Sequence, residues 1–167
     1  MEAGILFHFA RRTDECGNAI KCAAGCFGIG ISKVKPCTNE SYLNGRIANM
    51  LKKTDMLFIV GRSGDRRPDC AAEIFKTLEI PLDGAGEPKG VMALCGMEKE
   101  GYIIESIKQA IIILPDFPEE ISAMLPAVFG RLGRKFGLEG SLPETCVFDG
   151  GKILRDCLEH AGGASEG

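Results

Sequence analysis

Residues 61–70 place glycine, serine, arginine and aspartate directly after the apolar run at 56–60, in the order Gly-Arg-Ser-Gly-Asp-Arg-Arg-Pro-Asp-Cys. The glycines at 61 and 64 would let the backbone approach a ligand closely. A helix that begins near Pro68 would direct its N–H groups and its positive dipole end at the same point. The segment therefore predicts a loop that holds an anionic ligand above the end of a strand.

The side chains of this loop suit phosphate chemistry. The Ser63 hydroxyl and the guanidinium groups of Arg66 and Arg67 are donors for a phosphate or a carboxylate. Asp69 would hold a magnesium ion or orient a nucleophile. The alternative is that Asp65 and Asp69 only complement the dipole of the helix that follows.

A second segment of the same form follows the apolar run at 110–114 and reads Leu-Pro-Asp-Phe-Pro at 114–118. Pro115 and Pro118 would shape the entry into a long helix. Asp116 would cap that helix and, with Glu119, form a D-x-x-E variant of the capping box. Its negative charge would lie where an anion would otherwise bind.

Other chemistries lack their motifs. The chain contains no G-x-x-x-x-G-K-[ST] and no G-x-S-x-G, and His8 is expected to be a core or edge histidine. Eight cysteines occur without a C-x-x-C pair, and only two histidines are present. Cys22 and Cys26 would share a helix face, which leaves a metal or cluster site open, but reduced apolar thiols are the favoured interpretation.

The spacing of apolar residues predicts the strands and helices that must position these loops. Strands are expected at 4–10, 29–34, 56–60, 91–94, 102–105 and 110–114, the last two as a hairpin or neighbouring pair. Helices are expected at 18–26, at 38–53 capped by Thr38, at 68–78 and at 118–136, the last kinked at Pro126. This alternation predicts a three-layer α/β/α domain with a mainly parallel sheet over residues 1–140. Residues 141–167 are expected to form a C-terminal extension with a short helix at 152–160 and a frayed tail.

Composition limits the partners. The chain has 167 residues, 45% of them hydrophobic, with 20 basic and 23 acidic side chains and a net charge of −3. Such a balance does not favour nucleic acid, and no apolar run approaches the roughly 20 residues of a membrane span. The N-terminus does not resemble a signal peptide, so we expect a cytoplasmic protein.

On these loops the sequence resembles the molybdopterin-binding domain shared by molybdenum-cofactor biosynthesis proteins and the competence/damage-inducible family. The first family loop, T-G-G-[TL]-G with an aspartate five residues later, is similar to residues 60–64 and Asp69. The second, L-P-G-x-P, is similar to residues 114–118, and an upstream G-[FY]-x-x-E is similar to residues 101–105. The likeness covers roughly residues 3–140. Val60, Arg62 and Asp116 depart from the pattern.

The resemblance implies a pterin phosphate or nucleotide, such as molybdopterin, bound between the two loops, and homo-oligomers that are dimers or trimers. Asp69 would then be the catalytic residue and a magnesium ligand. The ligand-binding residues implied are Gly61, Arg62, Ser63, Gly64, Asp65, Arg66, Pro115, Asp116 and Pro118. Two alternatives stay open, which are a magnesium-dependent pyrophosphatase acting on dinucleotides of the ADP-ribose type and a non-catalytic interaction or regulatory module.

Overall fold

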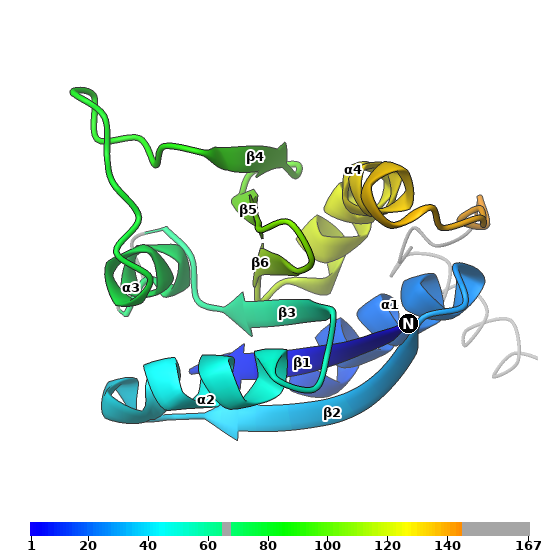
Figure 1. Cartoon of the computed structure of the whole chain (residues 1–167), viewed down its shortest axis with the longest axis horizontal. Helices are drawn as coiled ribbons and strands as arrows, with labels where there is room; N and C mark the ends of the chain where they lie inside the picture. Colours follow the sequence, from blue (N-terminus) through cyan, green and yellow to red (C-terminus); the bar gives the residue numbers. More distant parts are fainter. Residues whose placement is uncertain (65–67, 145–167) are drawn as a thin grey trace, which may run out of the picture.

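A six-stranded sheet with the order β2-β1-β3-β6-β5-β4 organises the residues that the structure, a computed structural model, describes, namely 1–64 and 68–144 (Figure 1). The four strands β2, β1, β3 and β6 are parallel, whereas β5 and β4 run antiparallel to their neighbours. The elements are β1 (Glu2–His8), α1 (Thr13–Cys26), β2 (Gly30–Cys37), the 3₁₀ helix η1 (Glu40–Tyr42), α2 (Leu43–Leu51), β3 (Met56–Gly61), α3 (Cys70–Thr77), β4 (Val91–Cys95), β5 (Glu100–Glu105), β6 (Ala110–Pro115) and α4 (Pro118–Phe136).

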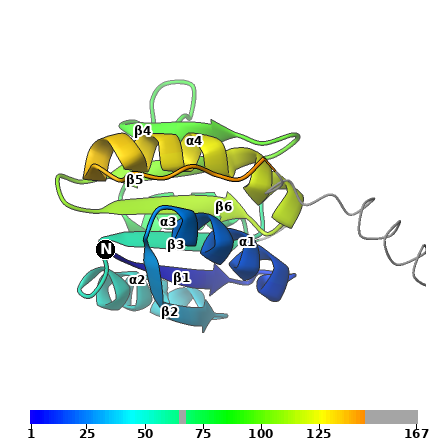
Figure 2. The same ribbon diagram turned by 90° about the vertical axis from the view of Figure 1, so that its right-hand side faces the viewer.

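Helices cover both faces of the sheet, which confirms the predicted α/β/α arrangement. Helices α1 and α4 pack on one face, in front of the sheet in Figure 2, and α2 and α3 pack on the other. Strand β3 serves both cores because Phe58 faces the first pair of helices and Leu57 and Ile59 face the second. A strand buried on both faces has the continuous apolar sequence that residues 56–60 show.

Several predicted boundaries were wrong, and each correction has a local cause. Strand β1 ends at His8 because Phe9 has a φ of 50° and leaves strand geometry. Asn39, not Thr38, accepts the capping hydrogen bond before η1 and α2, and Asp69, not Pro68, precedes α3 as its N-cap. Helix α4 has the predicted bounds and continues through Pro126, because buried residues on both sides of the proline hold the helix against the sheet.

The chain beyond α4 stays on the α1–α4 face as far as the structure describes it. Leu138 and Leu142 pack against that core, so the packed part passes the boundary predicted at residue 140. The predicted short helix at 152–160 and the predicted tail lie outside the described residues. Across the ranges 1–64 and 68–144, no helix has the length and apolarity needed to cross a membrane.

Candidate ligand-binding site at the carboxyl edge of the sheet

The two loops that the sequence singled out meet at one edge of the sheet. The last residues of three parallel strands, His8, Gly61 and Pro115, stand in register across β1, β3 and β6. The loops that follow these strands therefore start side by side, and the backbone N–H of Asp116 donates to the carbonyl of Gly61 at 2.9 Å. This edge is where open α/β sheets bind ligands.

Gly61 and Gly64 are required by the local structure for two different reasons. A Cβ added at Gly61 would lie 2.6 Å from Cβ and Sγ of Cys70 and 2.7 Å from the carbonyl oxygen of His8, so only glycine lets α3 pack this close. Gly64 has a φ of 74°, a left-handed conformation that favours glycine. Both residues are thus explained by the fold before any ligand is considered.

Asp69 closes the loop rather than lying inside the helix. One carboxylate oxygen accepts from the N–H of Gly64 at 2.9 Å, and the other accepts from the N–H of Ala72 at 2.9 Å. The N–H of Cys70 donates to the carbonyl of Arg62 at 2.8 Å. Three of the backbone donors predicted to cradle an anion are therefore used within the protein, and a ligand at this loop must be held mainly by side chains.

Asp116 has a partner far away in sequence. Its side chain is 1% exposed and accepts from the backbone N–H of Arg11, in the loop after β1, at 2.9 Å. The predicted capping box was wrong, because the N-cap of α4 is Phe117, which makes no side-chain cap. Pro118 is the first residue of α4, as predicted, and Pro115 ends β6.

A groove of about 350 Å³ opens between the Gly61–Asp69 loop and the turn that joins β4 to β5. Its lining is Ser63, Gly64, Asp69, Ala71, Glu98, Lys99, Glu100 and Tyr102. The Ser63 Oγ is buried and has no hydrogen-bond partner among the described residues. Lys99 reaches over this end of the sheet, with its Nζ 5.8 Å from the centre of the Phe117 ring. The groove thus combines one ammonium, one available hydroxyl and three carboxylates.

Glu120, which the sequence analysis did not identify, holds the β4–β5 turn in place. Its side chain is 6% exposed and accepts from the backbone N–H groups of Met97, Glu98 and Lys99 at 2.8, 3.0 and 3.3 Å. A Cβ at Gly96 would clash with the Glu120 carboxylate. Because Glu120 lies in the first turn of α4, it fixes the backbone of Lys99 relative to the edge of the sheet.

Tyr102 forms the side of the groove as a neutral phenol. Burial, followed by its hydrogen bond to Glu100 at 3.0 Å, raises the pKa of Tyr102 to about 12. The ring packs edge to face against Phe75 of α3, with the centroids 5.0 Å apart. It therefore contributes an apolar surface and a hydroxyl that is already donated.

The remaining groups at this edge are unsuited to nucleophilic chemistry. Burial raises the pKa of the Cys70 thiol strongly and raises that of Cys16 to about 12, so both stay protonated. His8 is fully buried, as predicted for a core residue, and neither ring nitrogen has a hydrogen-bond partner within residues 1–64 and 68–144. Burial lowers the pKa of His8, opposed by the Cys37 carbonyl and by Glu73 and Glu40.

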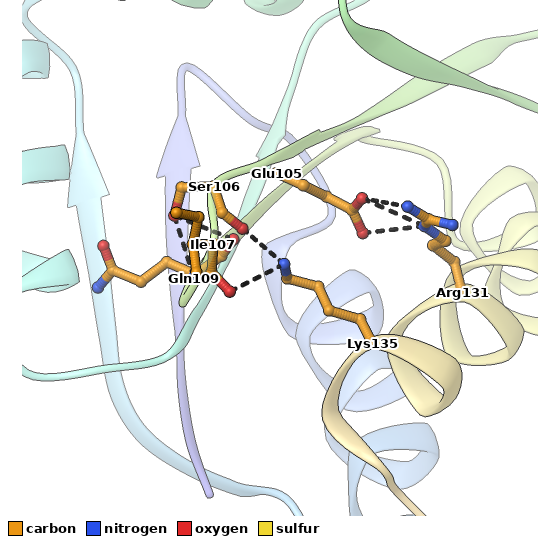
Figure 3. Close-up of polar contacts among 6 residues, drawn as sticks. All are labelled: Glu105, Ser106, Ile107, Gln109, Arg131 and Lys135. Carbon is orange, nitrogen blue, oxygen red and sulfur yellow. Dashed lines mark hydrogen bonds and ion pairs between the residues drawn. The ribbon is translucent and has the colours of Figure 1, made fainter.

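The G-[FY]-x-x-E segment has structural roles, and its glutamate lies at the opposite end of the sheet. A Cβ at Gly101 would lie 2.7 Å from the carbonyl oxygen of Ile113 and 2.9 Å from Sδ of Met124. Glu105 forms a bidentate ion pair with Arg131, and Lys135 donates to the carbonyls of Ser106 and Ile107 (Figure 3). These contacts fix the far end of α4 against the β5–β6 turn.

The structure thus brings Gly61, Ser63, Gly64 and Asp69 together. Asp116 lies in the adjoining connection, between Pro115 at the end of β6 and Pro118 at the start of α4. Arg62, which follows Gly61 in the first loop, is partly buried. The predicted ligand residues Asp65 and Arg66 lie outside the described residues. Within the described ranges no group of three or more His, Cys, Asp or Glu side chains could hold a metal ion.

The comparisons with known proteins find relatives by structure only. No protein-family model and no curated protein sequence matches the chain. Among solved structures, the CinA protein of unknown function from Thermoplasma acidophilum superposes with a TM-score of 0.66 at 14% identity, covering 78% of this chain and 97% of that one. The tungsten cofactor synthesizing protein MoaB from Pyrococcus furiosus gives 0.56 at 15% identity, covering 81% and 94%. The molybdopterin biosynthesis enzyme MoaB from Thermus thermophilus gives 0.56 at 13% identity, covering 84% and 99%.

These structures share the fold that the loop resemblance implied. The match extends over nearly the whole length of each of them, so the correspondence concerns the entire domain. It confirms a molybdopterin-binding-domain-like α/β/α fold, while activity has to be argued from the site itself.

Proposed function

We propose that this protein binds a pterin phosphate or a nucleotide in the groove between the Gly61–Asp69 loop and the β4–β5 turn. The observation that carries the proposal is the buried Ser63 hydroxyl without a partner in the described residues, placed with Lys99 at the carboxyl edge of the sheet. A phosphate would accept from the Ser63 hydroxyl and from the Lys99 ammonium. A link to molybdenum cofactor biosynthesis is supported by the fold shared with a MoaB that is a molybdopterin biosynthesis enzyme and a MoaB that synthesizes tungsten cofactor.

The mixed charge of the groove indicates what else the ligand must carry. Asp69, Glu98 and Glu100 would repel a ligand that bears only negative charge. Pterins and purines carry amino groups on a flat ring, and carboxylates accept from such donors. A ligand with a phosphate at one end and an amino-substituted heterocycle at the other therefore fits both parts of the groove.

We expect magnesium to bind at this site only together with the phosphate of the ligand. Each oxygen of Asp69 already accepts one backbone N–H, and in the described residues no group of three or more His, Cys, Asp or Glu side chains could hold a metal ion. Magnesium is commonly held by one or two carboxylates plus the phosphates of a substrate, which is the arrangement that Asp69 would allow. When bound, such an ion would neutralise phosphate charge.

Isothermal titration calorimetry with molybdopterin under anaerobic conditions, with AMP and with ADP-ribose, each with and without magnesium, tests the proposal. We expect Lys99→Met and Ser63→Ala each to weaken binding about tenfold or more, because both side chains would donate to the charged phosphate and a hydrogen bond to a charged group contributes about 1.5–3 kcal/mol. Lys108→Met, which removes an exposed lysine at the opposite end of the sheet, is the matched control and should leave binding unchanged.

The alternatives predict other outcomes in the same samples. A pyrophosphatase would release AMP from ADP-ribose only with magnesium, and Asp69→Asn would abolish that release. An interaction module would show no heat with any of the three compounds. Absence of binding to all three, or equal affinity for the native protein and the Lys99→Met variant, would refute the proposed site.

A further inference from the structure

The two edges of the sheet differ in how they resist pairing with another strand. The β2 edge contains Lys33, Lys35 and Pro36, and a register shift opposite Ala3 and Gly4 marks a bulge. Lysine, proline and bulges are the devices by which exposed edges avoid association. The opposite edge of the sheet in Figure 1 is β4. Its sequence, Val-Met-Ala-Leu-Cys at 91–95, has none of the three.

The hydrogen-bond pattern identifies the backbone groups that β4 leaves open. The N–H of Gly96 donates to the carbonyl of Lys99, so this pair belongs to the hydrogen-bonded set of the β4–β5 ladder. Because hydrogen-bonded and non-hydrogen-bonded pairs alternate, Leu94 and Met92 bond to β5, whereas Cys95, Ala93 and Val91 direct N–H and C=O outward. These three residues are evenly spaced about Ala93.

Exposed apolar side chains accompany this open edge. Met92 is 38% exposed and Met97, in the turn that follows, is 68% exposed. Cys95 and Ala93 are exposed as well. A neutral strand with unpaired backbone groups and exposed methionines is an edge that another strand would cover.

We infer that β4 pairs antiparallel with β4 of a second copy of this chain, about a two-fold axis at Ala93. In this register Ala93 lies opposite itself and Val91 opposite Cys95 of the second copy, which forms about six backbone hydrogen bonds. Charge also favours it, because Lys89, before β4, would lie opposite Met97 of the second copy and next to Glu98 in the same turn. A parallel arrangement would place like charges side by side and would not close on itself.

Light scattering after size-exclusion chromatography tests the interface on the full chain. The native protein is expected at twice 17.9 kDa. Ala93→Pro removes an outward N–H without touching the bonds to β5, so this variant is expected to be monomeric with an unchanged circular dichroism spectrum. Val34→Lys, on the β2 edge, is the control and should stay dimeric. A monomeric native protein, or a folded Ala93→Pro variant that is still a dimer, would overturn the inference.

A cross-link gives a test that does not depend on disrupting the strand. Cα atoms of a hydrogen-bonded antiparallel pair lie about 5.5 Å apart, which a disulfide spans. Ala93→Cys is therefore expected to form a disulfide between two copies, identified as the 93–93 pair by peptide mapping under non-reducing conditions. Met92 lies opposite Leu94 of the second copy, so the two residues 92 are displaced by two positions along the strands. They are too far apart for a disulfide, and Met92→Cys should not cross-link at that position. Equal cross-linking of both variants, or none for Ala93→Cys, would refute the register.

Discussion

Replacing Gly61 by alanine tests whether glycine is needed at this position for the packing of α3 or for contact with a ligand. The added Cβ would meet Cβ and Sγ of Cys70 at 2.6 Å and the His8 carbonyl oxygen at 2.7 Å, where ordinary contacts begin near 3.4 Å. The His8 carbonyl cannot retreat because β1 is paired on both sides. Helix α3 must therefore move away from the sheet and take Asp69 with it.

The size of the effect follows from these contacts. Overpacking of a buried position costs about 1–3 kcal/mol, and a fixed backbone oxygen places this case at the upper end. Alanine also lowers the conformational entropy of the unfolded chain, which stabilises the folded protein by about 0.4–1 kcal/mol. We expect a net loss of about 2 kcal/mol in the free energy of unfolding, which lowers Tm by roughly 4–8 °C for a domain of this size.

Urea unfolding followed by circular dichroism, on ligand-free protein, measures this loss. Gly45→Ala is the matched control, because a Cβ there meets nothing within 4 Å in α2 and should stabilise the helix by about 0.5–1 kcal/mol. Cys70→Gly removes both side-chain collisions, so the double variant should be less destabilised than the sum of the single variants. If Gly61→Ala unfolds at the same urea concentration as the native protein, the packing explanation is wrong and glycine is needed only for a ligand.

Three further changes test the loops and the strand ends. Gly64→Ala should destabilise by about 1–2 kcal/mol in the same urea assay, because alanine is strained at a φ of 74°. Glu120→Gln replaces one acceptor by a donor facing three backbone N–H groups; we expect about 1–3 kcal/mol of destabilisation and faster amide exchange at residues 97–99, and unchanged exchange there would contradict the clamp. The lowered pKa of His8 means that the unfolded chain binds its proton more readily than the native protein, so stability should be full above about pH 6.5 and fall below it. His8→Gln should flatten this part of the pH profile, measured by thermal unfolding between pH 5 and pH 8, and an equally steep profile would exclude His8 as its source.

Local sequence predicted elements whose determinants lie within one or two turns. Helix α4 has the predicted bounds because Pro118 starts it, a continuous apolar stripe follows, and Gly137 ends it with a φ of 63°. The buried strands β3 and β6 were found because their apolar runs are uninterrupted. The mainly parallel direction of the strands followed from the alternation of elements, whereas their order in the sheet was not predicted.

Side-chain partners across long separations could not be predicted in this way. The residues around Asp116 are suited to helix capping, yet its carboxylate accepts a hydrogen bond from the backbone N–H of Arg11, 105 positions away. From sequence, Glu120 looks like an ordinary acidic residue in the first turn of a helix. Its three backbone N–H donors belong to the β4–β5 turn, which only the folded chain brings next to it. Gly61 was interpreted as a ligand contact because a glycine required by a neighbouring helix and one required by a ligand look the same in sequence.

The attachment of α4 at both of its ends has a consequence for how the chain folds. Glu120 binds the β4–β5 turn at one end of the helix, and Arg131 and Lys135 bind the last residue of β5 and the β5–β6 turn at the other (Figure 3). Residues 91–136 are thus joined by contacts of short sequence separation, whereas pairing β1 with β3, or β3 with β6, closes roughly fifty residues of chain. Local contacts form at a lower entropic cost. We therefore expect the two hairpins and α4 to assemble first and to present the edge of β6 as the template on which β3, β1 and β2 are added in turn.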